Sequence, residues 1–318
     1  MIRAAIVGIG GWGRNLVAAV QGRSEQIRFV AGATRTPEKA ADFCRQHGIS
    51  LAASYDELLA DRAIDAVVLA TPHSQHCEQI IAAARAGKHV FVEKPLGLVA
   101  VGYNWRFQPA LVEARRMLED ARLGKLLHIE GNFCGPSAYR FAREHWRHDP
   151  AEVPAGGMTG RGVHVVDAML YLAGSPIGSV FAQSDRLVHD FGVDDTTSVL
   201  FRLRSGATAY LGTVIATAET WRLQIFGSKG WVQVGDVEHL HTWELQRCFI
   251  DPQDVTRKQR PELVTFPKTS TERAELEHFA KAAAARRPLA VPGGDEVHNV
   301  AVLEAIVRSA REGARIHL

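Results

Sequence analysis

The sequence predicts an α/β protein in which a doubly wound parallel sheet is followed by an α+β domain with an open, mainly antiparallel sheet. In the first third of the chain, short apolar runs alternate with segments whose apolar residues recur at helical spacing. This alternation is typical of a parallel sheet covered by helices on both faces. After Pro109 the apolar runs come in pairs joined by short turns, and helices close the chain. We therefore predict a first domain at residues 1–103 and a second at residues 104–318.

The predicted elements follow this division. In the first domain the strands are RAAIVGIG, IRFVAGAT, IDAVVLATP and KHVFVEKP, and the helices between them are RNLVAAVQG, TPEKAADFCRQHG and HCEQIIAAARAG. Proline after a threonine at residues 36–37 and glycines at 48 and 87 are typical of helix starts and stops. In the second domain we predict helices at 110–124, 162–174, 272–286 and 295–312, a strand at 125–133, and hairpins that turn at 204–206 and 227–230.

Composition limits the classes of function. The chain has 318 residues, of which 46% are apolar and 23% charged, and its net charge of +2 gives no support to nucleic-acid or anionic-membrane binding. Its four cysteines are scattered, which favours a reducing compartment and argues against a structural zinc site. The N-terminus lacks the features of a signal peptide, and no apolar run approaches the roughly 20 residues of a membrane helix. We predict a cytoplasmic protein without a bound metal.

A glycine turn follows the first strand. Gly8-Ile9-Gly10-Gly11-Trp12-Gly13 matches G-x-G-x-x-G between a strand and a helix, the context in which the pattern indicates a dinucleotide site. The first glycine permits a tight turn, the second lets the backbone approach a pyrophosphate, and the third lets helix and strand pack closely. The alternative is a glycine-rich turn without a ligand.

The end of the second strand indicates which dinucleotide is bound. An acidic residue for the ribose hydroxyls is expected there, but the chain has Ala33-Thr34-Arg35-Thr36. Arg35, with hydroxyls from Thr34 or Thr36, suits a 2′-phosphate, so we predict NADP as the preferred cofactor, with NAD possible. The alternative is that Arg35 only stacks on the adenine.

Five motifs in order carry a resemblance to a known family: the glycine turn, ATPHSQH (70–76), AGKHVFVEKP (86–95), NWRFQP (104–109) and GGMTGRGVHVVD (156–167). The chain resembles, over essentially its whole length, the glucose–fructose oxidoreductase, inositol dehydrogenase and rhizopine-catabolism family, written Gfo/Idh/MocA. The resemblance implies a Rossmann domain followed by an open-sheet domain. It also implies NAD(P)-dependent chemistry at a carbohydrate or cyclitol carbon, and a homodimer or homotetramer built through the open sheet.

The resemblance also implies roles for individual residues. Lys94 matches the family's lysine beside nicotinamide and the substrate hydroxyl, and His164 matches the histidine that exchanges a proton with the substrate. Asp167 matches an aspartate that orients rather than reacts. These residue types suit the reaction, because a histidine titrates near neutrality and a lysine cation stabilises a developing alkoxide. Further residues expected at the cofactor are Thr71, Pro72, His76 and Glu93.

Two departures from the family pattern stand out. Gly160 occupies a position where many members carry an aspartate, four residues before the histidine. The second departure is the missing crossover helix after Pro95, because parallel neighbours need a connection of about a dozen residues or more. We interpret this as a segment absent from the sequence, with the join near Leu98 and Val99. The alternative is a genuine deletion, which would force the next strand out of the parallel sheet.

Other residues are candidates for contact with the substrate. The loop at 139–150 contains Trp146 and Arg147, which suit stacking on a ring and binding of an anionic group; an exposed or subunit-contacting loop is the alternative. Arg106 lines the cleft or packs structurally. The histidine pairs 73/76 and 239/241 lack the further ligands of a metal site.

The sequence therefore predicts an NADP-preferring oxidoreductase acting on a sugar, cyclitol or related small molecule. Two alternatives stay open. One is a nicotinamide-assisted glycosidase. The other is a non-catalytic NAD(P)-binding sensor or scaffold, which is supported by the glycine at position 160 in place of the family's aspartate.

Overall fold

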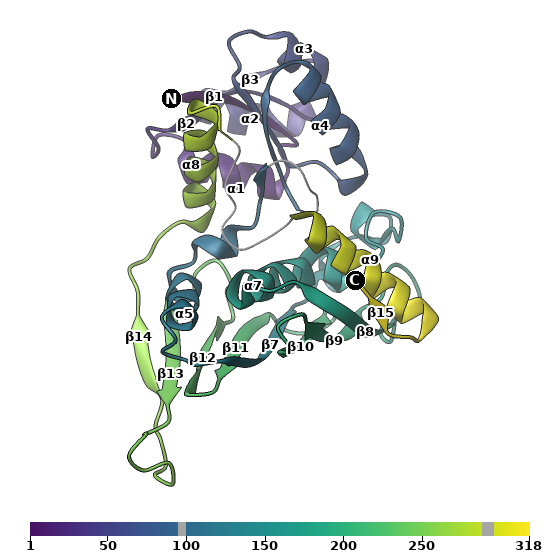
Figure 1. Cartoon of the computed structure of the whole chain (residues 1–318). Coiled ribbons are helices and arrows are strands. Elements are labelled where there is room, and N and C mark those ends of the chain that lie inside the picture. The colour runs from purple at the N-terminus through teal and green to yellow at the C-terminus, as the bar shows by residue number, and fades with distance from the viewer. Residues whose placement is uncertain (95–99, 288–295) are drawn as a thin grey trace. The chain divides into compact units, whose positions relative to one another are not determined.

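The computed structural model describes residues 1–94, 100–287 and 296–318. Their contacts form two compact units, each with its own sheet (Figure 1). The first unit comprises the described residues of Met1–Asn104 and Ser270–Val291, and the second comprises those of Trp105–Thr269 and Pro292–Leu318.

The first unit is built on a sheet of six parallel strands in the order β3-β2-β1-β4-β5-β6. From β1 the chain adds β2 and β3 on one side, and it then adds β4, β5 and β6 on the other side. The direction in which strands are added therefore reverses beside β1, as in a doubly wound fold. The predicted parallel sheet is confirmed. Its strands are β1 (Ile2–Val7), β2 (Ile27–Ala33), β3 (Ser50–Leu51), β4 (Ala66–Leu69), β5 (His89–Val92) and β6 (Ala100–Val101).

Five α-helices of the described chain belong to this unit: α1 (Gly11–Val20), α2 (Pro37–His47), α3 (Tyr55–Ala60), α4 (His76–Arg85) and α8 (Thr271–Ala284). Helix α8 groups with this unit by its contacts, whereas the predicted division placed everything after residue 103 in the second domain. Its buried residues Leu276, Phe279, Ala280 and Ala283 join the hydrophobic core around β1 and α1. The ring of Phe279 lies 5.7 Å from that of Phe91 on β5. The apolar face of α8 therefore returns the chain to the first unit.

The connection between β5 and β6 is short, as the sequence suggested. Only the seven residues 93–99 separate the two strands. Strand β6 nevertheless pairs in parallel with β5, with Phe91 opposite Ala100 and Val92 opposite Val101. The displacement expected for a deletion is therefore not observed, and the join proposed at 98–99 lies outside the described residues.

The second unit contains a nine-stranded sheet in the order β14-β13-β12-β11-β7-β10-β9-β8-β15, in which β7 and β10 are parallel and every other described pair is antiparallel. The mainly antiparallel sheet and both hairpins were predicted and are confirmed. The prediction missed β8, β13, β14 and β15. The strands are β7 (Leu126–Cys134), β8 (Ile177–Asp185), β9 (Thr196–Leu203), β10 (Thr208–Val214), β11 (Thr220–Gly227), β12 (Gly230–Asp236), β13 (Glu244–Phe249), β14 (Glu262–Thr265) and β15 (Ile316–His317).

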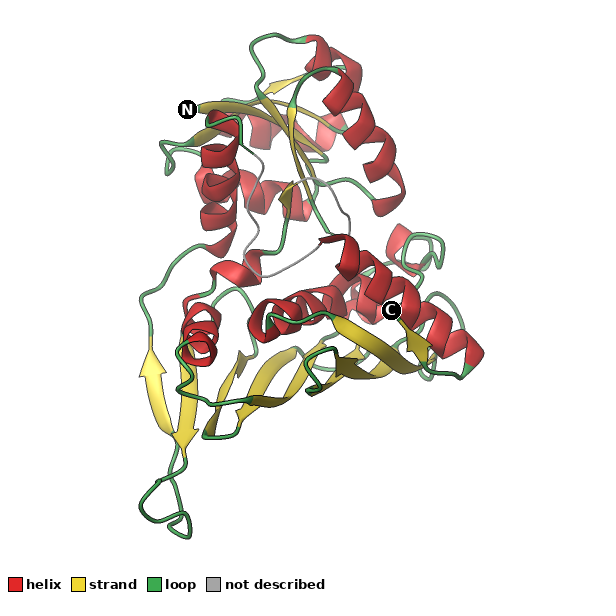
Figure 2. Cartoon of the chain, viewed as in Figure 1, coloured by secondary structure: helices red, strands yellow, loops and turns green. Residues whose placement is uncertain are grey.

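Helices of the second unit lie on one face of this sheet, and no described helix covers the other face (Figure 2). They are α5 (Pro109–Glu119), α7 (Val163–Ala173) and α9 (Glu296–Glu312), and the short α6 (Ser137–Arg140) follows the end of β7. Every residue from Val163 to Leu172 is buried, so α7 is enclosed by the sheet and its neighbouring helices. Among the described helices, none combines the length and apolar character needed to cross a membrane.

Candidate active site

The turn between β1 and α1 has two positions that only glycine can occupy. Gly8 has φ +92°, and a Cβ there would lie 2.5 Å from the carbonyl oxygen of Ala70. A Cβ at Gly13 would lie 2.1 Å from the carbonyl oxygen of Gly8. Both distances are far below van der Waals contact, so these glycines are required for β1, β4 and α1 to pack as they do.

Gly10 and Gly11 differ from these two because no described atom lies within 4 Å of a Cβ built at either position. Gly10 is the N-cap of α1, and among the described residues no side chain accepts a hydrogen bond from the amides of the first turn, which also contains no acidic residue. Uncapped amides at a helix start favour an anion. The open space and these amides together fit the pyrophosphate of a dinucleotide.

The end of β2 carries positive charge and hydroxyls. Arg35 is exposed and makes no ion pair among the described residues, and Thr34 Oγ1 accepts a hydrogen bond from the Thr36 amide at 3.5 Å. The prediction missed Arg14, whose guanidinium donates to the carbonyl of Lys39 at 2.6 Å. Lys39 lies near the start of α2, which begins directly after Thr36. The Arg14 guanidinium is therefore a second cation near the end of β2.

The segment after β4 is held by side-chain hydrogen bonds. Thr71 Oγ1 donates to Gln79 Oε1 at 2.6 Å, and His76 Nε2 lies 3.0 Å from the carbonyl oxygen of Thr71. The His76 side chain is fully buried. This burial favours a role in holding Thr71 and Pro72 in place over direct contact with a nucleotide.

Glu93 and Lys94 follow β5 at the same edge of the sheet. Glu93 is buried, and a Cβ at Gly102 would lie 2.8 Å from its Oε1 atom. Burial raises the pKa of Glu93 to about 7, although Lys94 and the nearby Trp12 indole oppose the shift. The carboxyl edge of β1, β4 and β5 therefore combines the glycine turn with a lysine and a carboxyl group that titrates near neutrality.

In the second unit, His164 lies in the first turn of α7 within an aromatic cluster. Its ring stacks on Trp105 at a centroid distance of 5.5 Å and lies 6.2 Å from the rings of both Phe133 and His239. Trp105 Nε1 donates to His239 Nδ1 at 3.2 Å. The sequence suggested His239 only as one of two histidines with the spacing of metal ligands. Its sequence position gave no sign that it approaches His164.

Asp167 lies one turn further along α7 and is engaged on two sides. Arg106 Nε donates to its Oδ2 at 2.8 Å, the Arg106 Nη2 atom also binds Oδ1, and Asn299 Nδ2 donates to Oδ1 at 2.9 Å. All three side chains are buried. Burial raises the pKa of Asp167, and both partners oppose that rise. This arrangement favours an orienting role for Asp167 and a structural role for Arg106.

A π-helical turn, Met158–Gly162, precedes α7, and turns of this kind often occur at functional sites. It contains Gly160, the position of the family aspartate. Among the residues that the structure describes, no atom lies within 4 Å of a Cβ built at Gly160, and its φ is not left-handed. Neither the backbone conformation nor a described neighbour therefore requires glycine here.

The aromatic loop before this turn is packed against itself. The Arg147 guanidinium lies 4.2 Å from the centre of the Trp146 ring, which also stacks on His145 at 5.7 Å. Trp146 further packs against the small core formed by Ala138, Val153, Val193 and Ile215. The indole already has stacking partners, which favours the structural interpretation of this loop.

No group of three or more potential metal ligands occurs in the part of the chain that the structure describes. His241 instead bonds Glu238 at 2.9 Å, and His73 packs edge-on against His76.

Comparison with known families gives two adjoining matches. Residues 2–115 match the model described as the oxidoreductase family with an NAD-binding Rossmann fold, GFO_IDH_MocA. Residues 111–233 match the model of the GFO/IDH/MocA C-terminal domain. The two matches together extend through the glycine turn, Lys94 and the α7 motif.

Individual proteins match over the whole length. Inositol 2-dehydrogenase of Rhizobium meliloti is 28% identical over 345 aligned positions, covering 100% of this chain and 99% of the relative. D-xylose 1-dehydrogenase (NADP(+)) 2 of Haloferax volcanii is 28% identical, covering 98% of both chains. The structure of aldose-aldose oxidoreductase from Caulobacter crescentus, complexed with glycerol, superimposes with a TM-score of 0.86 at 26% identity, covering 100% of this chain and 99% of that one.

The first of these alignments is longer than the chain. It extends over 345 positions although the chain has 318 residues. The relative therefore has residues without a counterpart here.

Proposed function

The chain belongs to the Gfo/Idh/MocA family of oxidoreductases, and on that premise we propose that it transfers a hydride between a nicotinamide cofactor and a carbinol or carbonyl carbon of a sugar, cyclitol or related small molecule. As a member of this family it is an NAD(P)-dependent enzyme acting on CH–OH groups. The names of the inositol and xylose relatives support the substrate class. The observation that carries the proposal is the turn in which Gly8 and Gly13 are sterically required while Gly10 and Gly11 leave open space.

Bound nicotinamide would supply the two-electron chemistry, and the protein's own side chains would handle the proton and the charge on oxygen. We propose that His164 removes the hydroxyl proton as the carbonyl forms and returns it in the reverse direction. Its aromatic surroundings restrict the ring to one orientation. Lys94 stabilises the negative charge that develops on the substrate oxygen.

Asp167 acts in this proposal through position and not through proton transfer. Its carboxylate is occupied by Arg106 and Asn299, which come from outside α7. The three buried groups fix the rotation of α7 about its axis and so the direction in which His164 points.

For the cofactor, we propose that NADP is preferred over NAD. The exposed Arg35 and the absence of a carboxylate at the end of β2 support this choice, because a 2′-phosphate gains a cationic partner while an unmodified ribose loses its acceptor. NADPH is expected to bind about tenfold or more tightly than NADH in a fluorescence titration. The variant Arg35→Ala should reduce NADPH affinity alone, whereas Arg28→Ala, on the exposed side of β2, should change neither. Equal affinities in the unchanged protein would contradict the preference.

We further propose that the protein forms a homodimer or homotetramer through the uncovered face of the nine-stranded sheet. Leu200 on β9 and Tyr210 on β10 are 56% and 38% exposed, and Arg222 on β11 pairs with Glu130 on β7 at 3.1 Å. An apolar surface flanked by charged pairs is typical of a protein interface. Light scattering should report a multiple of the 34.8 kDa chain, and Leu200→Glu should lower the mass.

The catalytic proposal is tested with a panel of inositols, aldoses and ketoses, supplied with oxidised or reduced cofactor as each requires. Turnover of at least one compound is expected. His164→Ala should lower kcat by about 10²–10⁴-fold while leaving the affinity for NADPH unchanged. His128→Ala, which alters a histidine on β7 that bonds Thr208, is the matched control. A His164→Ala enzyme with unchanged kcat would remove that residue from the mechanism.

A further inference from the structure

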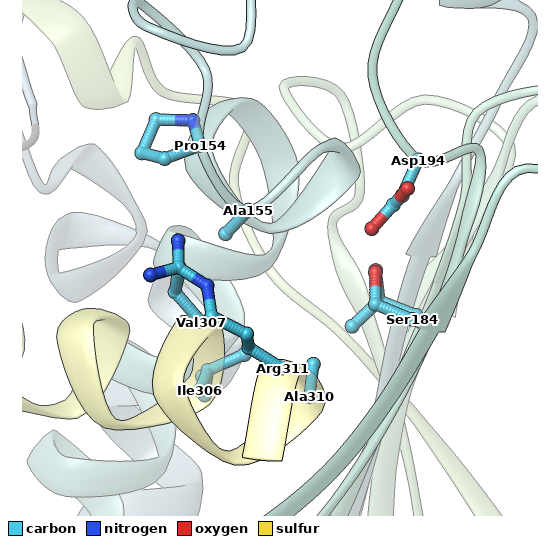
Figure 3. A pocket seen from close by; sticks show the side chains of 9 residues that line it. Pro154, Ala155, Ser184, Asp194, Ile306, Val307, Ala310 and Arg311 are labelled. Atoms are coloured by element: carbon cyan, nitrogen blue, oxygen red, sulfur yellow. The ribbon is translucent and has the colours of Figure 1, made fainter. Parts of the chain in front are cut away.

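A cavity of about 260 Å³ lies within the second unit, bounded by α9, the ends of β8 and β9, and the loop before the π-helical turn (Figure 3). Its walls contain both charged and apolar side chains. The lining residues are Pro154 and Ala155 from the loop, Ser184, Asp194 and Thr197 from the strand ends, and Ile306, Val307, Ala310 and Arg311 from α9.

This cavity is separate from the group around Asp167. Asn299, which bonds Asp167, lies near the start of α9, whereas Ala310 and Arg311 lie near its end. At 1.5 Å per residue, the two places are about 16 Å apart along the helix. Neither Lys94 nor His164 lines the cavity.

The cavity carries one charge of each sign on opposite walls. Figure 3 shows Arg311 extending along the α9 side and Asp194 entering from the strand side, where its carboxylate points toward Ser184. Neither charged group forms an ion pair with any residue that the structure describes. Ser184 and Thr197 add hydroxyls 2.8 Å apart. A ligand that carries one positive and one negative charge would pair with both Asp194 and Arg311.

The surface between the charges is aliphatic. Ala155 and Ile306 are buried, and Val307 and Ala310 continue the same apolar strip along α9. The volume suits a small metabolite of about ten heavy atoms, because larger ligand sites typically start at about 300 Å³. A dinucleotide is too large for it, and an uncharged sugar would form no ion pair with either Asp194 or Arg311.

We infer that this cavity binds a free α-amino acid with an aliphatic side chain. The ammonium group contacts Asp194 and the hydroxyls beside it, and the carboxylate contacts Arg311. The side chain lies on Ile306 and Ala310. The inference concerns binding alone and does not depend on the proposed dehydrogenase activity.

Isothermal titration of the full chain with L-leucine and L-valine tests the inference. Saturable binding of one molecule per chain is expected. N-acetyl-L-leucine, which lacks the ammonium charge, and L-leucinamide, which lacks the carboxylate, should each bind about tenfold or more weakly. Asp194→Asn and Arg311→Gln should weaken L-leucine binding to a similar degree.

Matched controls come from the same elements. Asp190→Asn changes an exposed aspartate on the loop before β9, and Arg308→Gln changes an α9 arginine that pairs with Glu312 outside the cavity. Both should retain binding. Absence of L-leucine and L-valine binding to folded protein would overturn the inference, as would equal binding of N-acetyl-L-leucine. If either cavity variant unfolds, the probe series on the unchanged protein decides the question alone.

Discussion

Helices α1 and α7 both begin after a glycine-containing turn, and the two turns are fixed by different forces. At α1 the backbone itself sets the requirement, because a Cβ at Gly13 would lie 2.1 Å from the carbonyl oxygen of Gly8. At α7 no atom of the described residues lies within 4 Å of a Cβ at Gly160. The α1 turn therefore requires its glycine, whereas no described neighbour imposes the same requirement before α7.

The stabilising partners differ in the same way. The α1 turn is restricted by the carbonyl oxygens of Gly8 and Ala70, which directly follow β1 and β4, while α7 is held by side chains far away in the sequence. Arg106 lies 61 residues before Asp167, and Asn299 lies 132 residues after it. The start of α1 is specified by local backbone contacts, and the start of α7 by tertiary contacts. Different substitutions should therefore destabilise the two helix starts.

The largest effect is expected from Asp167→Ala, which removes the tertiary support of α7. The change leaves the Arg106 guanidinium buried without its carboxylate, and breaking a buried pair in this way costs about 3–5 kcal/mol. Urea unfolding of the full chain should show this loss in the free energy of unfolding.

The double variant Arg106→Met, Asp167→Leu is the control for that experiment. It removes both charges and fills much of the same volume, so it should be less destabilised than Asp167→Ala. If the double variant were the less stable of the two, the pair itself would be the source of stability and not the cost of an unpaired charge.

The next largest effect should come from Gly13→Ala, which breaks the local requirement at α1. The added methyl group meets a backbone carbonyl that cannot rotate away, so we expect a loss of about 2–3 kcal/mol and of dinucleotide binding. Gly11→Ala adds the same methyl group two residues earlier, where there is open space. It should leave the free energy of unfolding within about 0.5 kcal/mol. Similar losses in both variants would show that the distinction between these glycines is wrong.

The same difference between local and tertiary contacts explains which features could be predicted from the sequence. The glycine turn and the parallel sheet were predictable because local steric demands and apolar periodicity leave a direct trace in the residue pattern. The position of His239 beside His164 was not, since only the packing of the strand ends brings them together. Helix α8 was identified as a helix, but its return to the first unit depends on which core its apolar face meets.

An effect of similar size is expected at the end of β5, where pH tests the carboxyl group of Glu93. Its pKa is raised from 4.5 to about 7 by burial, so the folded state holds this proton more tightly than the unfolded chain. The stability that this proton provides is complete below about pH 4.5 and is lost as the pH rises through about 7, on the order of 3 kcal/mol in total.

Glu93→Gln should remove this part of the pH dependence, because the amide does not titrate. The measurement is the free energy of unfolding at several pH values for both proteins. The difference between them should grow in favour of Glu93→Gln from pH 4.5 to 7. Parallel curves would mean that Glu93 ionises with little cost.

The smallest effect on stability, and the most informative one for function, is expected from Gly160→Asp. No described atom meets a Cβ at this position, and an acidic residue near a helix start is favourable, so the free energy of unfolding should change by less than about 1 kcal/mol. A carboxylate four residues before His164 should raise the pKa of that histidine. The acid limb of the kcat/KM profile, measured with the best compound of the sugar and cyclitol panel, should therefore move to higher pH.

Gly160→Asn has the same shape without the charge and should leave the acid limb in place. A shift in both variants would assign the effect to shape, whereas a shift in neither would mean that position 160 does not act on the histidine. A loss of more than about 2 kcal/mol in Gly160→Asp would show that this glycine, like Gly13, is required by the fold.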